Sequence, residues 1–258
     1  MKSFVFILTT AFILSASANA DDMIAQSYPI SSVLELSAGG GVEVDITQGD
    51  TESLRVETTP EIMKRIKVDL TGHKLTLGLK NDRGNFFHWF NNNDDQVKFI
   101  LQIKHLNLLD FSGAAQANVS DYHGEKLLVK TSGAGQTHFS DLRVNELDID
   151  SSGAANTEIQ TINSQKISVG LSGASNFIVK KSGTAGHLTV EASGASSFHG
   201  KSLNVTEGDV RASGASNIEV RATGMLKAGA SGASNIDYYG SAKVTSDSSG
   251  ASHIDGHK

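Results

Sequence analysis

The 258-residue chain lacks cysteine altogether and contains only two prolines and one tryptophan. Without cysteine, it has no disulfide bond, no thiolate chemistry and no lipid attachment through a cysteine side chain. Past residue 20, no stretch approaches the roughly 20 apolar residues that a transmembrane helix needs. Hydrophobic residues still make up 38% of the chain, which excludes a disordered protein.

Motifs of common enzyme chemistry are also lacking. The chain has no Gly-x-Ser-x-Gly elbow, no His-Glu-x-x-His pair, no phosphate-binding loop and no Gly-Gly-x-Gly-x-Asp calcium repeat. Asp148 and Asp150 share an outward face, but such charged pairs are routine on a repeat surface. The acidic stretch Asn92-Asn93-Asp94-Asp95 has oxygen ligands suited to calcium, although turn composition explains it more simply. We therefore predict no catalytic residues, no metal site and no cofactor.

Histidines do not suggest a site either. Six of the nine lie in the repeat region at unlike positions, so they are not expected to stack into one cluster. They are His123, His138, His187, His199, His253 and His257.

What the chain does contain is a repeat. The tripeptide Ser-Gly-Ala occurs eight times, with gaps of 20, 20, 20, 21, 20, 18 and 18 residues between successive glycines. These glycines are Gly113, Gly133, Gly153, Gly173, Gly194, Gly214, Gly232 and Gly250. A constant period near twenty with strand-like alternation indicates one coil of a β-solenoid stacked on the next.

Apolar or small residues fall at even offsets from each glycine, and polar residues mostly at odd offsets. Around Gly173, for example, Leu171, Ser175 and Phe177 share one predicted face. A period of two over a dozen residues predicts strands with one buried face. We predict an all-β fold with a parallel, β-helix-like solenoid over residues 110–258, right-handed by the usual preference of parallel crossovers.

The motif itself predicts a corner or narrow edge of every coil. Gly173 and Gly214 fall in the inward phase, and we expect no room there for a branched side chain. The residue before each motif glycine is Ser, and the residue three places after it is Asn or Gln in most copies. Because stacked coils place like positions about 4.8 Å apart, ladders of Ser and of Asn/Gln hydrogen bonds are expected. Stacking is the simplest role of the motif, and a repeated ligand-binding or ice-like template is the alternative.

Residues 30–110 lack the motif but alternate strongly. The sequence predicts one hairpin around Gln48-Gly49-Asp50, between Val42–Ile46 and Leu54–Val56, and a second around Thr71-Gly72-His73. We interpret this part as an N-terminal antiparallel β-hairpin region that covers one open end of the solenoid core.

The first twenty residues have the pattern of a secretory signal peptide. Met1-Lys2-Ser3 is a short basic start, residues 4–14 are apolar, and Ala18-Asn19-Ala20 is a small-residue cleavage site. Its removal leaves 21 basic residues, because Lys2 is lost from 22, against 28 acidic ones, a net charge of −7. We expect export to the periplasm, cell surface or medium, no transmembrane segment in the mature chain, and no nucleic-acid partner.

The order of these segments resembles a known family. Ser32-Val33-Leu34-Glu35-Leu36, then Gly41-Val42-Glu43-Val44, the strand Lys74-Leu75-Thr76-Leu77 and the Ser-Gly-Ala-Gly of residues 132–135 are similar to secreted bacterial proteins called putative auto-transporter adhesin, head GIN domain. The resemblance covers most of residues 21–258. It implies a mainly β, solenoid-like domain and, by its name, adhesion. It implies no established biochemical activity and no catalytic residues.

Three function classes follow from these observations. The first is a non-enzymatic, secreted or cell-envelope interaction or structural protein of adhesin type, with an unknown envelope protein or glycan as partner. The second is a carbohydrate-binding module. The third is a polysaccharide-active enzyme, which rests on fold analogy alone.

One segment interrupts the regular surface. Residues 86–90, Phe-Phe-His-Trp-Phe, hold four of the sixteen aromatic residues and the single tryptophan between two polar stretches. The polar borders predict a loop between two strands. We interpret Phe86, Phe87, Trp89 and Phe90 either as an end-cap or self-association contact, which allows a homo-oligomer, or as a site for a glycan or apolar partner.

Overall fold

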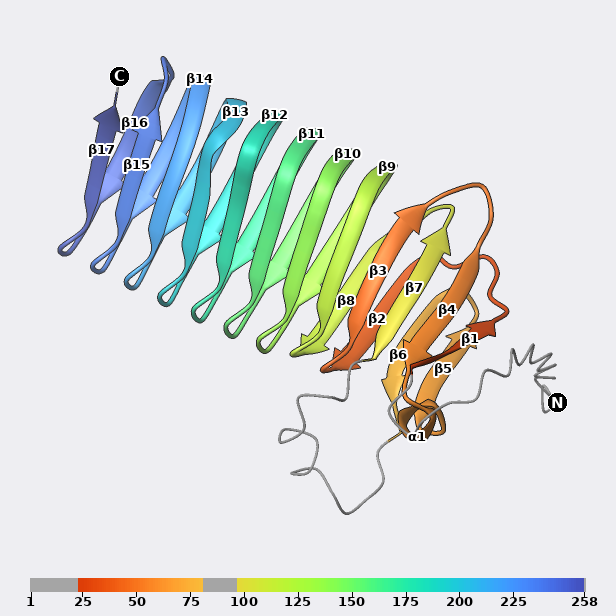
Figure 1. The fold of residues 1–258 in the computed structure, drawn as a ribbon. Helices are drawn as coiled ribbons and strands as arrows, with labels where there is room; N and C mark the ends of the chain where they lie inside the picture. Colours follow the sequence, from red (N-terminus) through yellow and green to blue (C-terminus); the bar gives the residue numbers. More distant parts are fainter. Residues whose placement is uncertain (1–22, 81–96, 258) are drawn as a thin grey trace, which may run out of the picture.

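Each coil of the solenoid is a long, bent strand followed by a Ser-Gly-Ala turn. The computed structural model describes residues 23–80 and 97–257, and Figure 1 shows the coils side by side along one axis. The long strands are β9 (Gln116–Thr131), β10 (Gln136–Ser151), β11 (Asn156–Leu171), β12 (Asn176–Ala192), β13 (Ser197–Ala212) and β14 (Asn217–Ala230). The last coils contain β15 (Asn235–Tyr239), β16 (Lys243–Ser248) and β17 (His253–His257).

Neighbouring coils pair in parallel, with motif opposite motif. Gln136 of β10 pairs with Asn156 of β11, and Ser151 pairs with Leu171 at the other end of the same strands. This confirms the predicted all-β, parallel solenoid.

The predicted alternation places the core correctly on both sides of each turn. Leu171, Ser175 and Phe177 are all at most 2% exposed. The rings of Phe177 and Phe198, one coil apart, stack with centroids 5.0 Å apart and planes 2° apart. Like side chains therefore form columns inside the coils, and each coil buries its apolar face only with its neighbours.

Each coil has two further corners that the sequence pattern did not predict. The pairing of β10 with β11 skips Ser140 and Asn145, and each is followed by another residue that is not buried. The coil therefore has three straight segments, 136–139, 141–144 and 146–151. At each corner two successive side chains point outward, so the positions that face the core change from even to odd offsets or back. A strict alternation counted from one glycine cannot predict this change.

The motif glycines lie at the turn tips, so their predicted inward placement is wrong. All eight are exposed, while the residues two places before and after Gly173, Leu171 and Ser175, are buried. Gly173 has φ of 76°, a left-handed conformation that favours glycine. The predicted lack of room is correct, because a Cβ on Gly173 would lie 2.5 Å from the carbonyl oxygen of Gly153. The obstacle is the backbone of the preceding coil rather than the core.

The stack begins before the first Ser-Gly-Ala motif. β2 (Glu35–Gly40) pairs in parallel with β8 (Leu108–Gly113), and β3 (Glu43–Gln48) with β9. One layer further out, β6 (Lys74–Leu79) pairs in parallel with β2, and β7 (Lys98–Ile103) with β3. Gly40 opposes Gly113 and thus takes the place of a motif glycine.

Antiparallel strands cover the N-terminal end of this stack. β5 (Ile66–Thr71) pairs with β6 in the second predicted hairpin, which is confirmed. The first predicted hairpin is wrong. β4 (Ser53–Thr58) pairs with β7 and with β1 (Ile24–Tyr28), because β7 and β9 already pair with β3. Alternation identified these strands, but local sequence did not reveal that β3 extends the parallel stack.

A short helix, α1 (Pro60–Met63), links β4 to β5 at the same end of the molecule (Figure 1). Pro60 suits its first turn, where the missing N–H has no helical partner. Ile62 and Met63 are 6% and 9% exposed and join the core. The predicted antiparallel N-terminal cap is therefore confirmed, with this helix as an additional part.

Candidate functional site

A second serine closes the turn in the later coils. In the last five coils the residue two places after the motif glycine is a serine. Four of these serines are buried, namely Ser175, Ser196, Ser216 and Ser234, and Ser252 is partly buried. The hydroxyl of each donates to the carbonyl of the serine before the glycine, for example Ser216 Oγ to Ser213 O at 2.8 Å. The sequence analysis placed Ser175 and Ser216 inward but did not predict this bond, although the repeated sequence Ser-Gly-Ala-Ser indicates it.

The predicted ladders form only in small part. Asn176 Nδ2 donates to Asn156 Oδ1 at 2.9 Å, and the described residues contain no other side-chain bond between neighbours in this row. The serines before the glycines do not bond to one another. Ser172 and Ser193 instead donate to the backbone carbonyls of Ser151 and Leu171, at 3.5 and 3.3 Å. The carbonyls of the preceding coil compete successfully for these hydroxyl protons.

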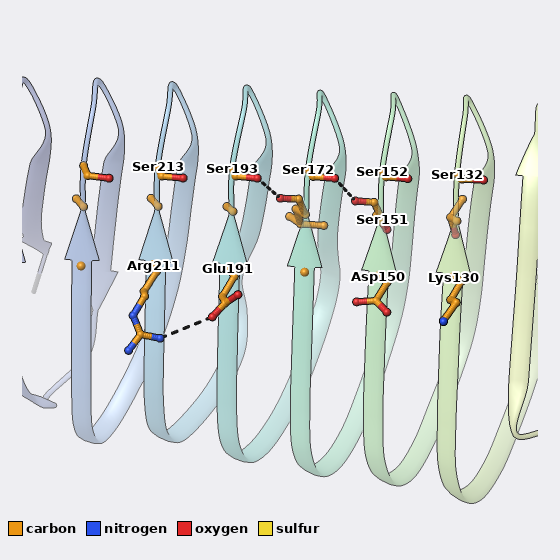
Figure 2. Close-up of a pocket in the computed structure, with 18 of the residues that line it drawn as sticks. Lys130, Ser132, Asp150, Ser151, Ser152, Ser172, Glu191, Ser193, Arg211 and Ser213 are labelled. Atoms are coloured by element: carbon orange, nitrogen blue, oxygen red, sulfur yellow. Dashed lines mark hydrogen bonds and ion pairs between the residues drawn. The ribbon is translucent and has the colours of Figure 1, made fainter.

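A continuous groove follows these serines across the coils. It has a volume of about 940 Å³, and its lining extends from Asp110 to Ser249. Figure 2 shows the serine row above the charged row, with one serine from each coil. In the described part of the chain, the hydroxyls of Ser132, Ser152 and Ser213 bond to no protein group. They are free to donate to, and accept from, a partner.

The other wall of the groove consists of the residues three places before each glycine. This row is Asp110, Lys130, Asp150, Gly170, Glu191, Arg211, Gly229 and Asp247. Its charges are mixed, and Arg211 forms an ion pair with Asp209 at 3.1 Å and a longer one with Glu191 at 3.8 Å (Figure 2). Gly170 and Gly229 interrupt the row without side chains. This row is therefore polar, with four acidic and two basic side chains, and it lacks a side chain at two points.

Several charged side chains outside the groove are held in their ionised forms. Hydrogen bonds to Asp148 and Glu146 raise the pKa of Lys126, and those from Lys166 and Lys126 lower the pKa of Glu146. Burial alone would raise the pKa of Asp45, but hydrogen bonds from Lys98 and Asn118 outweigh it and hold that pKa below its usual value. A general acid or base needs a pKa moved toward neutrality. These shifts go the other way.

Three of the repeat-region histidines pair singly with a carboxylate on the next coil, and His257 pairs with Asp237 on the preceding one. His138 contacts Glu158 at 3.3 Å, and His199 contacts Glu219 at 2.8 Å. Asp148, a candidate acid or base, is bound to Lys126 at 3.0 Å. Over residues 23–80 and 97–257, no group of three acidic or histidine side chains is arranged to hold a metal ion.

Several predicted features lie outside the described residues. These are the signal peptide of residues 1–20, the stretch Asn92-Asn93-Asp94-Asp95, and the aromatic residues Phe86, Phe87, Trp89 and Phe90. The aromatic segment connects β6 to β7. No helix in the described part is long and apolar enough to span a membrane.

Comparison with known proteins shows which family has this architecture. The family model described as putative auto-transporter adhesin, head GIN domain, matches residues 34–242. The chain belongs to this family. The match runs from β2 of the first parallel layers to the residue before β16, so it covers the cap except β1 and most of the serine-lined groove. No curated protein matches the chain.

Solved structures share the head GIN fold at low sequence identity. A putative adhesin from Parabacteroides merdae ATCC 43184 is 20% identical with a TM-score of 0.80, over 92% of this chain and 96% of that one. A putative adhesin from Parabacteroides distasonis ATCC 8503 is 20% identical with a TM-score of 0.83, over 92% and 97%. A protein from the same organism, described as a putative lipid binding protein, is 19% identical with a TM-score of 0.82, again over 92% and 97%. At these identities the likeness shows the fold alone.

Proposed function

We propose that the protein is an exported, non-enzymatic, adhesin-like binding protein that holds an extended surface glycan along its serine-lined groove. The observation behind this proposal is the continuity of the groove, from Asp110 to Ser249, across all the coils. One serine recurs in each coil, and coils repeat about every 4.8 Å. A linear polymer with regularly spaced hydroxyl groups meets the same contacts at each step.

The chemistry of the lining suits such a partner. A serine hydroxyl both donates and accepts hydrogen bonds, as a sugar hydroxyl does. Asp150 and Glu191 add acceptors and Lys130 adds a donor, all on exposed side chains. The family name supports adhesion, and the ionised, paired carboxylates support binding without catalysis. The signal peptide pattern supports export.

A variant in the open middle of the groove tests the proposal. Gly170 has no left-handed φ, and a Cβ there would meet the flexible end of Asp150 at 3.3 Å and, in ordinary contact, the Ile149 carbonyl oxygen at 3.8 Å. Gly170→Phe should therefore fold while filling the groove. Asn163→Phe is the matched control, because Asn163 is exposed on a different segment of the same strand.

The mature protein and both variants would be applied to a glycan array and to whole bacterial cells. We expect saturable binding by the parent and by Asn163→Phe, and at least tenfold weaker binding by Gly170→Phe. Equal binding by all three proteins would overturn the proposed groove. Release of shortened sugar products would show that the protein is an enzyme and would contradict the proposed non-enzymatic binding function.

A further inference from the structure

A second polar row, on a different segment of the coils, becomes basic toward the C-terminal half. It consists of the residues seven places after each motif glycine, namely Ser120, Ser140, Gln160, Lys180, Lys201, Arg221, Tyr239 and His257. The first three are neutral and the next three are cationic. Since the whole chain has a net charge of −6, this local concentration of positive charge is not a reflection of composition.

Three of these side chains converge on the ring of Tyr239. Lys201 Nζ lies 4.4 Å from the ring centroid, and Arg221 Cζ lies 5.8 Å from it. His257, from the following coil, stacks on the ring at 4.9 Å with the planes 22° apart. The two cations come from the two preceding coils, whereas His257 comes from the following one.

The backbone explains how Lys201 reaches a ring two coils away. The spacing between glycines falls from 20 residues to 18 at Gly214–Gly232. The pairing of β13 with β14 accordingly skips from Gly200 to Asn204. Lys201 thus stands on a bulge, where strands bend and side chains are redirected. Arg221 is fixed by a bond from its Nε to the Lys201 carbonyl oxygen, at 3.0 Å.

Both cations lack an anionic partner within the protein. Among residues 23–80 and 97–257, neither Lys201 nor Arg221 forms an ion pair, and the terminal nitrogens of Arg221 form no hydrogen bond. The neighbouring cation of the row, Lys180, is by contrast paired with Glu158 at 3.2 Å. Glu219, two places before Arg221, and Asp237, two places before Tyr239, are held by His199 and His257.

We propose that Lys201 and Arg221, oriented by Tyr239, bind the anionic groups of an acidic polysaccharide. Arg221 offers the two-pronged donor geometry that matches a carboxylate or a sulfate ester, and contact with the aromatic face restricts both cations to one place. Lys181, which also forms no ion pair in the described residues, extends the positive charge to a third successive coil. A polymer with regularly spaced charges therefore fits better than a single small anion.

This site is separate from the serine-lined groove, whose lining contains none of these residues. Its test consequently does not depend on the proposed function. The mature protein would be titrated calorimetrically with polygalacturonate, dextran sulfate and neutral dextran, at low and at physiological ionic strength. The first two polymers distinguish carboxylate from sulfate as the preferred group.

The variants are Arg221→Gln and Lys201→Gln, with Lys227→Gln as the control. Lys227 is exposed on the same strand as Arg221 and also forms no ion pair in the described part of the chain. We expect binding of at least one polyanion, at least tenfold weaker in either site variant and unchanged in Lys227→Gln. Arg221→Lys should fall between the parent and Arg221→Gln, because it keeps the charge but loses the planar fork.

Three results would overturn the site. They are no binding of either polyanion, equal weakening by Lys227→Gln, and binding of neutral dextran that Arg221→Gln weakens as strongly. Gly170→Phe should leave polyanion binding unchanged, so this site and the groove can fail separately.

Discussion

The carbonyl oxygen of Gly194 accepts a hydrogen bond from the Ala215 N–H at 2.7 Å, and it lies 2.6 Å from where a Cβ on Gly214 would be. The same atom therefore joins two coils and excludes any side chain from the next turn tip. Equivalent bonds join the Ala N–H of each motif to the glycine carbonyl of the preceding coil, up to Ala251 and Gly232 at 2.8 Å. The regular Ser-Gly-Ala spacing follows from this contact.

Gly214→Val should lower the free energy of unfolding by at least about 2 kcal/mol. The left-handed φ of 76° costs a branched residue about 1–2 kcal/mol, and crowding against Gly194 adds to this. Gly229→Ala is the control, because a Cβ there would meet only Arg211 Cγ at 3.7 Å. Urea unfolding of both variants measures the difference. Similar midpoints would show that the turn tip tolerates a side chain.

Ser216→Ala should cost about 1 kcal/mol, because it removes the buried hydroxyl that donates to Ser213 O. Ser213→Ala changes the other serine of the same turn. Its hydroxyl bonds to no group in the described residues, so no change in stability is expected. Thermal melts of the two variants compare them directly, and a larger loss for Ser213→Ala would be inconsistent with the observed bond.

The Asp45–Lys98 pair predicts a pH dependence of stability. The folded pKa of Asp45 lies below its usual value, so its contribution is complete above the unfolded pKa of about 3.9 and is lost as pH falls through the folded pKa. Asp45→Asn should therefore melt below the parent at pH 7, with the gap narrowing toward pH 3. Asp255→Asn, at a carboxylate that forms no ion pair in the described residues, serves as control. A gap that widens on acidification would contradict this assignment.

Export should remove residues 1–20. Expression in a Gram-negative host, followed by intact-mass measurement of the periplasmic fraction, should show a chain that begins at Asp21. A mass that retains Met1–Ala20 would contradict the signal peptide prediction.

The fold was predictable where repetition made it visible. Alternation placed Leu171, Phe177 and Val210 in the core, and the motif spacing predicted stacked coils. The pairing of β3 with β7 was not predictable in this way, because Val44 and Phe99 are far apart in sequence and nothing local links them. The convergence of Lys201 and Arg221 on Tyr239 likewise depends on contacts between residues 38 and 18 positions apart. Such contacts follow from register, which the corners at Ser140 and Asn145 shift.

The sequence analysis kept a repeated ligand-binding template at the motif only as an alternative and did not predict the groove, although each of its rows is visible in the sequence. The serine before every glycine was interpreted as a ladder, because stacked hydroxyls at a short spacing can bond to one another. The structure instead directs Ser172 and Ser193 to the backbone and leaves Ser152 and Ser213 unbonded in the described residues. A regularly spaced row of serines, several of them with unbonded hydroxyls in the described residues, then becomes a surface that can bind a partner.

We propose that the groove binds an extended polymer through contacts repeated along the coils. The most direct measurement is the affinity of the mature protein for oligosaccharides of increasing length, cut from the glycan that it binds. Coils spaced about 4.8 Å apart predict that affinity rises with each added sugar until the oligosaccharide spans the lining from Asp110 to Ser249, about 34 Å, and then levels off. A single sugar that binds as tightly as the longest oligosaccharide would contradict the account.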